Sequence, residues 1–479
     1  MSAEAVRPRT PEQHTFDLDG VRVHHFPSEE ALTRAVLIFG VGHRDETLPT
    51  LGTLHALEHL VMDTVRRTPI EINASVDHTL TEFTAEGSPV LVTRFVEGVC
   101  RGLADPPVDR LRAEADVLAA EAAEAETGSA LTTARYGWRD LGVVGGPGPG
   151  PQGVGAEAVL AAARRWFVPA NALLIVDGPW LQGLRLPLPP GPRPAHAYVA
   201  PRRWSRPHAL TADGPACALS LILPPADRTG IGLVAVGLLR ARLTEVLRHE
   251  RGLTYALDAE LLAVADRCWD VIIESEPLPE RIREAAAALI DTTSALLSDG
   301  PTETEMEAAR AELLESTLGR DATISTVVDL AIGELLGSGL PRFEPEAVSA
   351  LTQEDLAGFL RALAGDVLYL VDEAAQPELD VRQIPVITGP PSVPGPLPAG
   401  DVFRPPLVAL AVSREARGAK IVLTDTGLVH QLGDEVWRLD WPEVAGVMRE
   451  SEGDLVVFGL DGTVIPLGPG LYRRGQRLL

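Results

Sequence analysis

The sequence predicts an α+β protein with two homologous domains, each a mainly antiparallel sheet with helices packed on one face, followed by a small, mainly β domain. Three observations in the 479-residue chain support this prediction. Strand and helix patterns recur in the same order in two successive segments. Each segment has a helix break of the same kind at the corresponding place, Asp105-Pro106-Pro107 in the first and Asp299-Gly300-Pro301 in the second. The C-terminal residues 407–479 instead carry short apolar runs separated by turn signals.

The first segment mixes apolar runs of strand length with longer runs of helical period. Period-two alternation and short apolar runs predict strands, whereas apolar residues repeating every three or four positions predict helices. In chain order, the predicted elements are strands at 21–26 and 35–41, a helix around His55, a strand at 80–84, helices at 90–103, 110–126 and 156–166, and a strand at 172–176.

The second segment repeats the order of strand, helix, strand and two helices. Its predicted elements are a strand at 217–223, a helix at 233–250, a strand at 257–264, and helices at 279–297 and 304–317. A repeat period near ~190 residues makes an internal duplication the economical explanation.

Composition shifts then divide the chain. We predict a first domain over 1–190, a second domain over 208–375, a Pro-rich linker over 376–406 and a β domain over 407–479 that resembles small pleckstrin-homology-like modules. The linker is expected to be extended and poorly packed. Trp437, Trp441 and Phe458 are the expected core aromatics of the β domain.

Charge and cysteine content exclude several classes of function. The chain has 67 Asp and Glu residues against 42 Lys and Arg residues, a formal net charge of -25, which repels nucleic acid and anionic lipid surfaces. No apolar run is long enough to cross a bilayer, so we expect no membrane insertion. Cys100, Cys217 and Cys268 form no C-x-x-C pair and no even-numbered framework, which favours a reducing cytoplasm.

The most informative motif is His55-Ala56-Leu57-Glu58-His59. On a helix, His55 and His59 lie one turn apart on a single face, so both imidazoles can converge on one ion, with Glu58 on the same side. Imidazole nitrogens suit zinc, and a catalytic zinc keeps one position open for a water whose pKa it lowers. The alternative is an ordinary helix that carries two histidines.

Zinc requires a third protein ligand, and the helix at 110–126 offers two carboxylates. Glu114 and Glu121 are seven residues apart and therefore share a helix face. Either carboxylate can reach the metal while the other orients a histidine N–H. Because this helix is rich in Glu and Ala, a solvated charged face is the alternative explanation.

Further motifs occur around this pentapeptide in a consistent order: Gly42-His43-Arg44-Asp45-Glu46, Ile72-Asn73-Ala74, Thr81-Glu82-Phe83, the pair Glu114 and Glu121, Trp166 to Asn171, and Arg248 to Tyr255. Together with H-x-x-E-H, they resemble the insulinase/pitrilysin/mitochondrial processing peptidase family of inverzincin zinc metallopeptidases. The resemblance covers roughly residues 14–375. It departs from the family between His59 and Asn73, where the chain is shorter and lacks an F-x-G-T-like continuation.

The resemblance implies a role for each residue that matches a family motif. It implies that His55, His59 and Glu121 bind Zn²⁺, that Glu58 is the general base, and that Glu114 occupies the family's second acidic position on that helix.

The same resemblance implies how substrate is held. Asn73 and Ala74 match the edge strand to which a peptide adds as an extra β-strand. Arg248 and Tyr255 match a pair in the second domain that approaches the scissile carbonyl and steadies the oxyanion.

The predicted function is therefore zinc-dependent endopeptidase activity on short or unfolded peptides. The resemblance implies that this chain is half of a clamshell and pairs with itself or with a related peptidase-like subunit. Two alternatives stay open: a non-catalytic scaffold or partner subunit that keeps the fold, and a peptide-maturation protease that trims a precursor.

Overall fold

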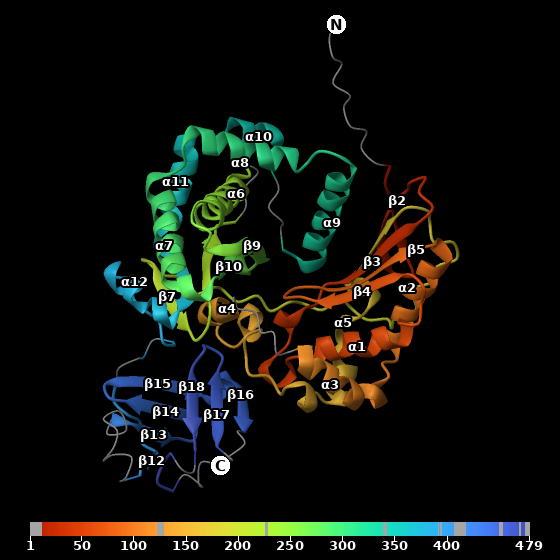
Figure 1. Ribbon diagram of the computed structural model, residues 1–479. Helices are drawn as coiled ribbons and strands as arrows, with labels where there is room; N and C mark the ends of the chain where they lie inside the picture. The colour runs from red at the N-terminus through yellow and green to blue at the C-terminus, as the bar shows by residue number, and fades with distance from the viewer. Residues whose placement is uncertain are drawn as a thin grey trace.

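The computed structural model describes residues 12–121, 129–225, 229–338, 343–390, 392, 395–406, 418–449, 454–468 and 471–474. For Ala120 and Glu121 it describes the backbone only. Within these residues the chain forms two layered α/β units and a C-terminal β region (Figure 1).

The first unit is a six-stranded sheet with helices on one face. The strands have the order β1-β2-β6-β3-β5-β4, and all neighbours are antiparallel except β2 and β6. Their bounds are β1 His14–Leu18, β2 Val21–Phe26, β3 Thr33–Phe39, β4 Glu71–Val76, β5 Thr81–Gly87 and β6 Ala172–Asp177. The helices on this face, which share one apolar core with the sheet, are α1 Thr53–Val65, α2 Pro89–Ala104, α3 Leu111–Glu121 and α5 Ala156–Trp166.

The second unit repeats this topology. Its strand order is β7-β11-β8-β10-β9, with β7 and β11 parallel, so it matches β2-β6-β3-β5-β4 strand by strand. The strands are β7 His208–Ala212, β8 Cys217–Leu223, β9 Thr254–Ala263, β10 Trp269–Pro277 and β11 Val367–Asp372. The helices that follow or pack on it are α6 Ile231–Thr244, α7 Ile282–Asp299, α8 Glu303–Glu315, α10 Pro345–Ala350 and α11 Gln353–Leu363.

Each unit contributes one helix that packs on the sheet of the other unit. Helix α4 (Ser129–Tyr136) of the first half places Leu131 and Tyr136 on the second sheet, against residues of β8, β9, β10 and β11. Helix α9 (Arg320–Leu336) of the second half places Leu335 and Leu336 on the first sheet, against residues of β2, β3 and β6. Both sheets are therefore covered on both faces, which explains why all seven residues of β8 are buried.

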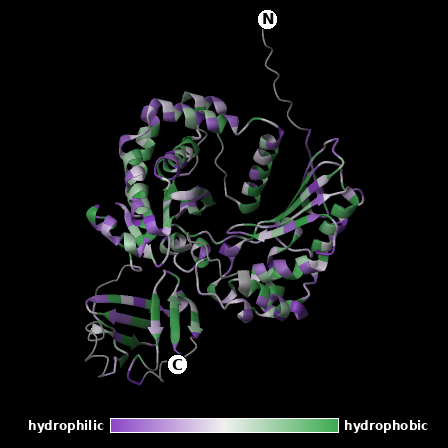
Figure 2. Cartoon of the chain, viewed as in Figure 1, coloured by the Kyte–Doolittle hydropathy of each residue, from purple (hydrophilic) through white to green (hydrophobic). Residues whose placement is uncertain are grey.

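The C-terminal residues form two small antiparallel sheets. The first has the order β12-β13-β14-β15 and the second β16-β17-β18. Their bounds are β12 Asp401–Phe403, β13 Lys420–Leu423, β14 Gly427–Leu432, β15 Glu435–Asp440, β16 Val444–Arg449, β17 Leu455–Gly459 and β18 Val464–Leu467. Strands β17 and β18, at the centre of this region, are mainly hydrophobic (Figure 2).

The prediction that residues 376–406 are extended and poorly packed is wrong at both ends of this segment. Gln376–Val381 forms helix α12, where Leu379 is fully buried, and Val386 makes a parallel bridge to Ala209 of β7. At the far end, Phe403 of β12 is buried in the β region. Apolar residues between the prolines pack against neighbouring elements, and composition alone does not reveal the stabilisation that this burial provides.

The β region is also docked on the first unit. Phe458 packs edge-to-face on Trp138, with 5.6 Å between ring centroids, and shares an apolar cluster with Leu48. The expectation that Trp441 is a core aromatic is wrong: 41% of it is exposed, and its indole N–H donates to the carbonyl of Asp425.

Candidate metal centre

Helix α1, which carries the H-x-x-E-H motif, is capped by a carboxylate from the preceding loop. Gly52, at the N-cap, has φ 87°, a left-handed conformation that glycine adopts without strain. The Glu46 carboxylate accepts hydrogen bonds from the backbone N–H groups of Gly52 and Leu54, at 3.2 and 2.9 Å. This satisfies two donors that a helix N-terminus leaves unpaired and places negative charge at the positive end of the helix dipole.

The apolar face of α1 fixes which way the motif points. Leu54, Leu57, Leu60 and Val61 are 0–1% exposed in the core of the first unit. Because side chains three and four positions apart share a helix face, this burial leaves His55 and His59 together on the opposite side, toward a cleft.

His55, Glu58 and His59 form a compact group of potential ligands. One ligand atom from each lies within 4.8 Å of the others. The Glu58 carboxylate is 4.0 Å from Nε2 of His55 and 3.7 Å from Nε2 of His59. The centroids of the two imidazole rings are 4.8 Å apart. In the part of the chain that the structure describes, this is the one group of three or more such side chains found close enough to hold a metal ion.

The cleft in front of this group has a volume of about 530 Å³ and is bounded by strand β4. Residues Ile72–Val76 of β4 line it, including Asn73 and Ala74. Since β4 is the last strand of its sheet, its outer edge has backbone groups available to an added strand. The structure thus brings the predicted substrate strand and the two predicted histidine ligands to one cleft.

Glu114 of α3 also lines the cleft, and its carboxylate lies 3.8 Å from Nδ1 of His59. Glu121 is the last residue of α3, two helical turns further on, and its side chain lies outside the described residues. Asp63 and Arg66 line the same cleft and were not among the predicted site residues. Asp63 stands four positions after His59, and this spacing is the signal that places it on the same face of α1.

Arg248 and Tyr255 lie in the second unit, apart from this cleft. The Arg248 guanidinium is 5.6 Å from the centroid of the Tyr255 ring, so the two side chains form a cation–π pair. Neither residue lines the cleft of its own chain, although β9 reaches the loop that follows β4, where Glu260 pairs with His78 at 3.4 Å. Arg248 occurs in a π-helical turn, Glu245–Glu250, where sequence periodicity predicted a continuous helix to residue 250. Such turns are frequent at functional sites.

The corresponding helix of the second unit has no metal-binding side chains at the matching positions. Like α1, α6 begins directly after a left-handed glycine, Gly230. Counted from these caps, Leu233, Val236 and Gly237 stand where α1 has His55, Glu58 and His59.

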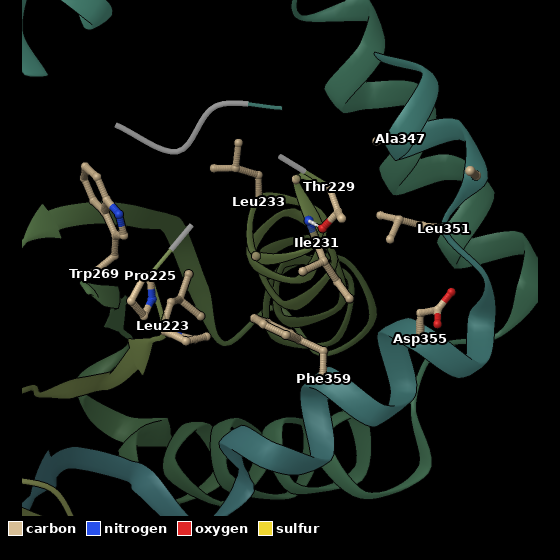
Figure 3. A pocket seen from close by; sticks show the side chains of 14 residues that line it. Leu223, Pro225, Thr229, Ile231, Leu233, Trp269, Ala347, Leu351, Asp355 and Phe359 are labelled. Carbon is tan, nitrogen blue, oxygen red and sulfur yellow. Dashed lines mark hydrogen bonds between the residues drawn. The ribbon is translucent and has the colours of Figure 1, made fainter. Parts of the chain in front are cut away.

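A separate cavity of about 740 Å³ lies at the start of α6. Figure 3 shows its apolar lining, with Leu223, Leu233, Trp269 and Phe359 around the space and Asp355 at one side. The described lining contains no histidine or cysteine and a single carboxylate, so it is not a candidate metal centre.

The fold is that of the M16 peptidases, the insulinase/pitrilysin type, which has two such units per half-clamshell. No protein-family model and no curated protein sequence matches the chain. Among solved structures, it is similar to an inactive domain of peptidase M16 from Pseudomonas fluorescens, with a TM-score of 0.58 and 14% identity over 75% of this chain and 97% of that one.

It is also similar to a protease from Helicobacter pylori, with a TM-score of 0.60 and 15% identity over 75% of this chain and 99% of that one. A third likeness is to the first half of the periplasmic protease PqqL from Escherichia coli, with a TM-score of 0.53 and 15% identity over 78% of this chain and 94% of that one. Among the described residues, no helix combines the length and the apolar character that crossing a membrane requires.

Proposed function

We propose that this protein is a zinc-dependent endopeptidase that hydrolyses short or unfolded peptides. The observation that carries the proposal is the placement of His55, Glu58 and His59 on one face of α1, opposite the open edge of β4, within an M16 peptidase fold.

The donor set fits zinc. The imidazoles of His55 and His59 lie within 4.8 Å of each other and of the Glu58 carboxylate, the proposed base, and Nδ1 of His59 faces the Glu114 carboxylate, as is usual for histidines that bind metal through the other nitrogen. His55, His59 and Glu121 would hold the ion. When bound, zinc polarises the scissile carbonyl and activates a water molecule for attack.

Side chains of this protein carry out proton transfer and hold the substrate. Glu58, 8% exposed beside both histidines, accepts the proton of the attacking water and delivers it to the leaving amine. Asn73 and Ala74 hold the peptide backbone along β4. Glu114 orients His59 through Nδ1.

The oxyanion donors in this proposal come from a second chain. Arg248 and Tyr255 do not line their own chain's cleft, so a dimer, with itself or with a related subunit, supplies them from the second unit of the partner. Enclosure between two half-clamshells favours short or unfolded peptides. The net charge of -25 favours neutral or basic ones and disfavours nucleic acid. A cytoplasmic location is proposed from the three unpaired cysteines.

The decisive experiment combines metal analysis with cleavage of a peptide library. We expect about one zinc per reconstituted chain, and loss of both zinc and cleavage in His55→Ala/His59→Ala. His14→Ala, which removes an exposed imidazole from β1, is the matched control and should retain both. Full zinc retention in the double variant would contradict the proposal.

A second candidate is a non-catalytic partner subunit, favoured by the likeness to an M16 domain described as inactive. It predicts no cleavage of any library peptide by zinc-loaded protein at any chain concentration. A peptide-maturation role is a narrower form of the enzyme proposal and predicts cleavage confined to one or a few sequences.

A further inference from the structure

We infer that Arg110 is a positioning residue for the metal centre: it bridges Asp63 and Glu114 and thereby holds the Glu114 carboxylate against His59. This inference rests on the proposed function and adds two residues, Asp63 and Arg110, to it. It is drawn from three consecutive ion pairs, His59–Glu114, Glu114–Arg110 and Arg110–Asp63, between α1 and the start of α3.

The four side chains are linked in series between α1 and the start of α3. His59 and Asp63 are one turn apart on α1, and Arg110 and Glu114 are one turn apart where the 3₁₀ turn Val108–Arg110 leads into α3. The Glu114 carboxylate is 3.8 Å from Nδ1 of His59 and 4.0 Å from the Arg110 guanidinium. Arg110 also forms an ion pair with Asp63, so it bridges the two carboxylates.

The carboxylates that Arg110 pairs with are largely buried, so the loss of their cation is costly. The Asp63 side chain is 3% exposed and that of Glu114 14%, and Glu58 stands nearby on α1 at 9%. Three carboxylates crowded into a partly buried cleft repel one another unless cations are placed between them. Arg66 pairs with Asp63 at 2.9 Å, but only Arg110 contacts both Asp63 and Glu114 among the ion pairs of the described residues.

The position of the Glu114 carboxylate determines the orientation of His59. A carboxylate at Nδ1 fixes the ring orientation and leaves Nε2 to face the metal position, where Glu58 also lies. Without Arg110, Glu114 would lose its nearest cation and turn toward solvent.

The test measures zinc affinity of the full-length chain by competition with a chromophoric chelator. Arg110→Ala is expected to weaken zinc binding by about 10- to 100-fold, the range for loss of support to a metal-binding histidine. Arg112→Ala, an exposed arginine two residues further along, is the matched control and should bind as the wild type does. Arg110→Lys, which keeps the charge without the planar fork, should recover part of the loss.

Two further measurements separate positioning from general destabilisation. In a Glu114→Gln background, Arg110→Ala should cause little additional loss, because Arg110 acts through Glu114. The visible absorption of the cobalt-loaded protein should change in Arg110→Ala and be unchanged in Arg112→Ala. Asp63→Asn/Arg110→Gln, which replaces the ion pair with neutral amides, serves if Arg110→Ala does not fold, and it should show the same loss of affinity.

The outcomes discriminate between this inference and the proposed function. If the wild type binds zinc and Arg110→Ala binds it within twofold, or if the loss is undiminished in the Glu114→Gln background, the positioning role is overturned alone. If the wild type binds no zinc, the proposed function fails and this inference fails with it.

Discussion

The cross-chain arrangement predicts that two inactive variants restore activity when they form a mixed dimer. Glu58→Gln removes the proton acceptor in the first unit, and Arg248→Ala removes an oxyanion donor in the second. Because Arg248 does not line the cleft of its own chain, the proposed dimer has working sites that each combine Glu58 from one chain with Arg248 from its partner. Each homodimer of either variant is therefore defective at both sites.

The size of the recovery follows from counting sites. A mixed dimer has one site that carries both substitutions and one site that carries neither. Purified mixed dimer should therefore have about half of the wild-type turnover per dimer, and a 1:1 mixture that has exchanged at random should have about a quarter, because half of its dimers are mixed.

The assay uses two affinity tags, one on each variant, and successive purification on both. Cleavage of a peptide found in the library screen is then compared with that of wild type carrying the same tags. A mixed dimer of two Glu58→Gln chains with different tags is the control and should stay inactive. If a confirmed Glu58→Gln/Arg248→Ala dimer shows no recovery while each variant binds zinc normally, the cross-chain site is refuted.

Three further predictions follow from the described contacts. Glu58→Gln should keep wild-type zinc content and lose cleavage by about 10²- to 10⁴-fold; unchanged turnover would show that another group accepts the proton. Arg135→Met should lower the free energy of unfolding by about 3–5 kcal/mol in urea titrations, because the fully buried Arg135 is one of two cations, with Arg203, that pair with the buried Asp366, and its loss also leaves the Ser220 hydroxyl and the Asp366 carbonyl without the hydrogen bonds that Arg135 donates; a loss below 1 kcal/mol would contradict this. Burial raises the pKa of Glu305, but hydrogen bonds led by that from Arg242 lower it overall to about 2, so its stabilising contribution is present above the unfolded-state pKa near 4.5 and is lost as the pH falls toward 2. The melting temperature of Glu305→Gln should thus lie below that of wild type at pH 7 and converge with it near pH 2, and a difference that does not change with pH would refute the assignment.

Local pattern predicted much of the fold. Strands β2 and β8 and helix α5 have the predicted bounds, because their apolar residues follow one period without interruption and turn residues flank them. Helix α1 was predicted from the same periodicity, which places His55 and His59 on one face whatever packs behind it.

Long-range packing was not visible in the sequence. Helix α9 was not among the predicted elements, and nothing in the sequence indicated that it covers the sheet of the other unit, since apolar periodicity does not identify a packing partner. The ion pair of Asp63 and Arg110 joins residues on different helices and depends on how α1 and α3 pack. The burial of Leu379 and Phe403 was not predicted, because the many prolines around them led to the prediction of an extended linker.

The position of α1 depends on parts of the chain that are remote from it in sequence. Its N-terminus is capped by Glu46, and the loop between them holds Leu48, which is buried in a cluster with Val456 and Phe458 of the C-terminal β region. Its far end is tied to α3 through Asp63. The C-terminal β region therefore belongs to the structural support of the candidate metal centre, although none of its described residues lines the cleft.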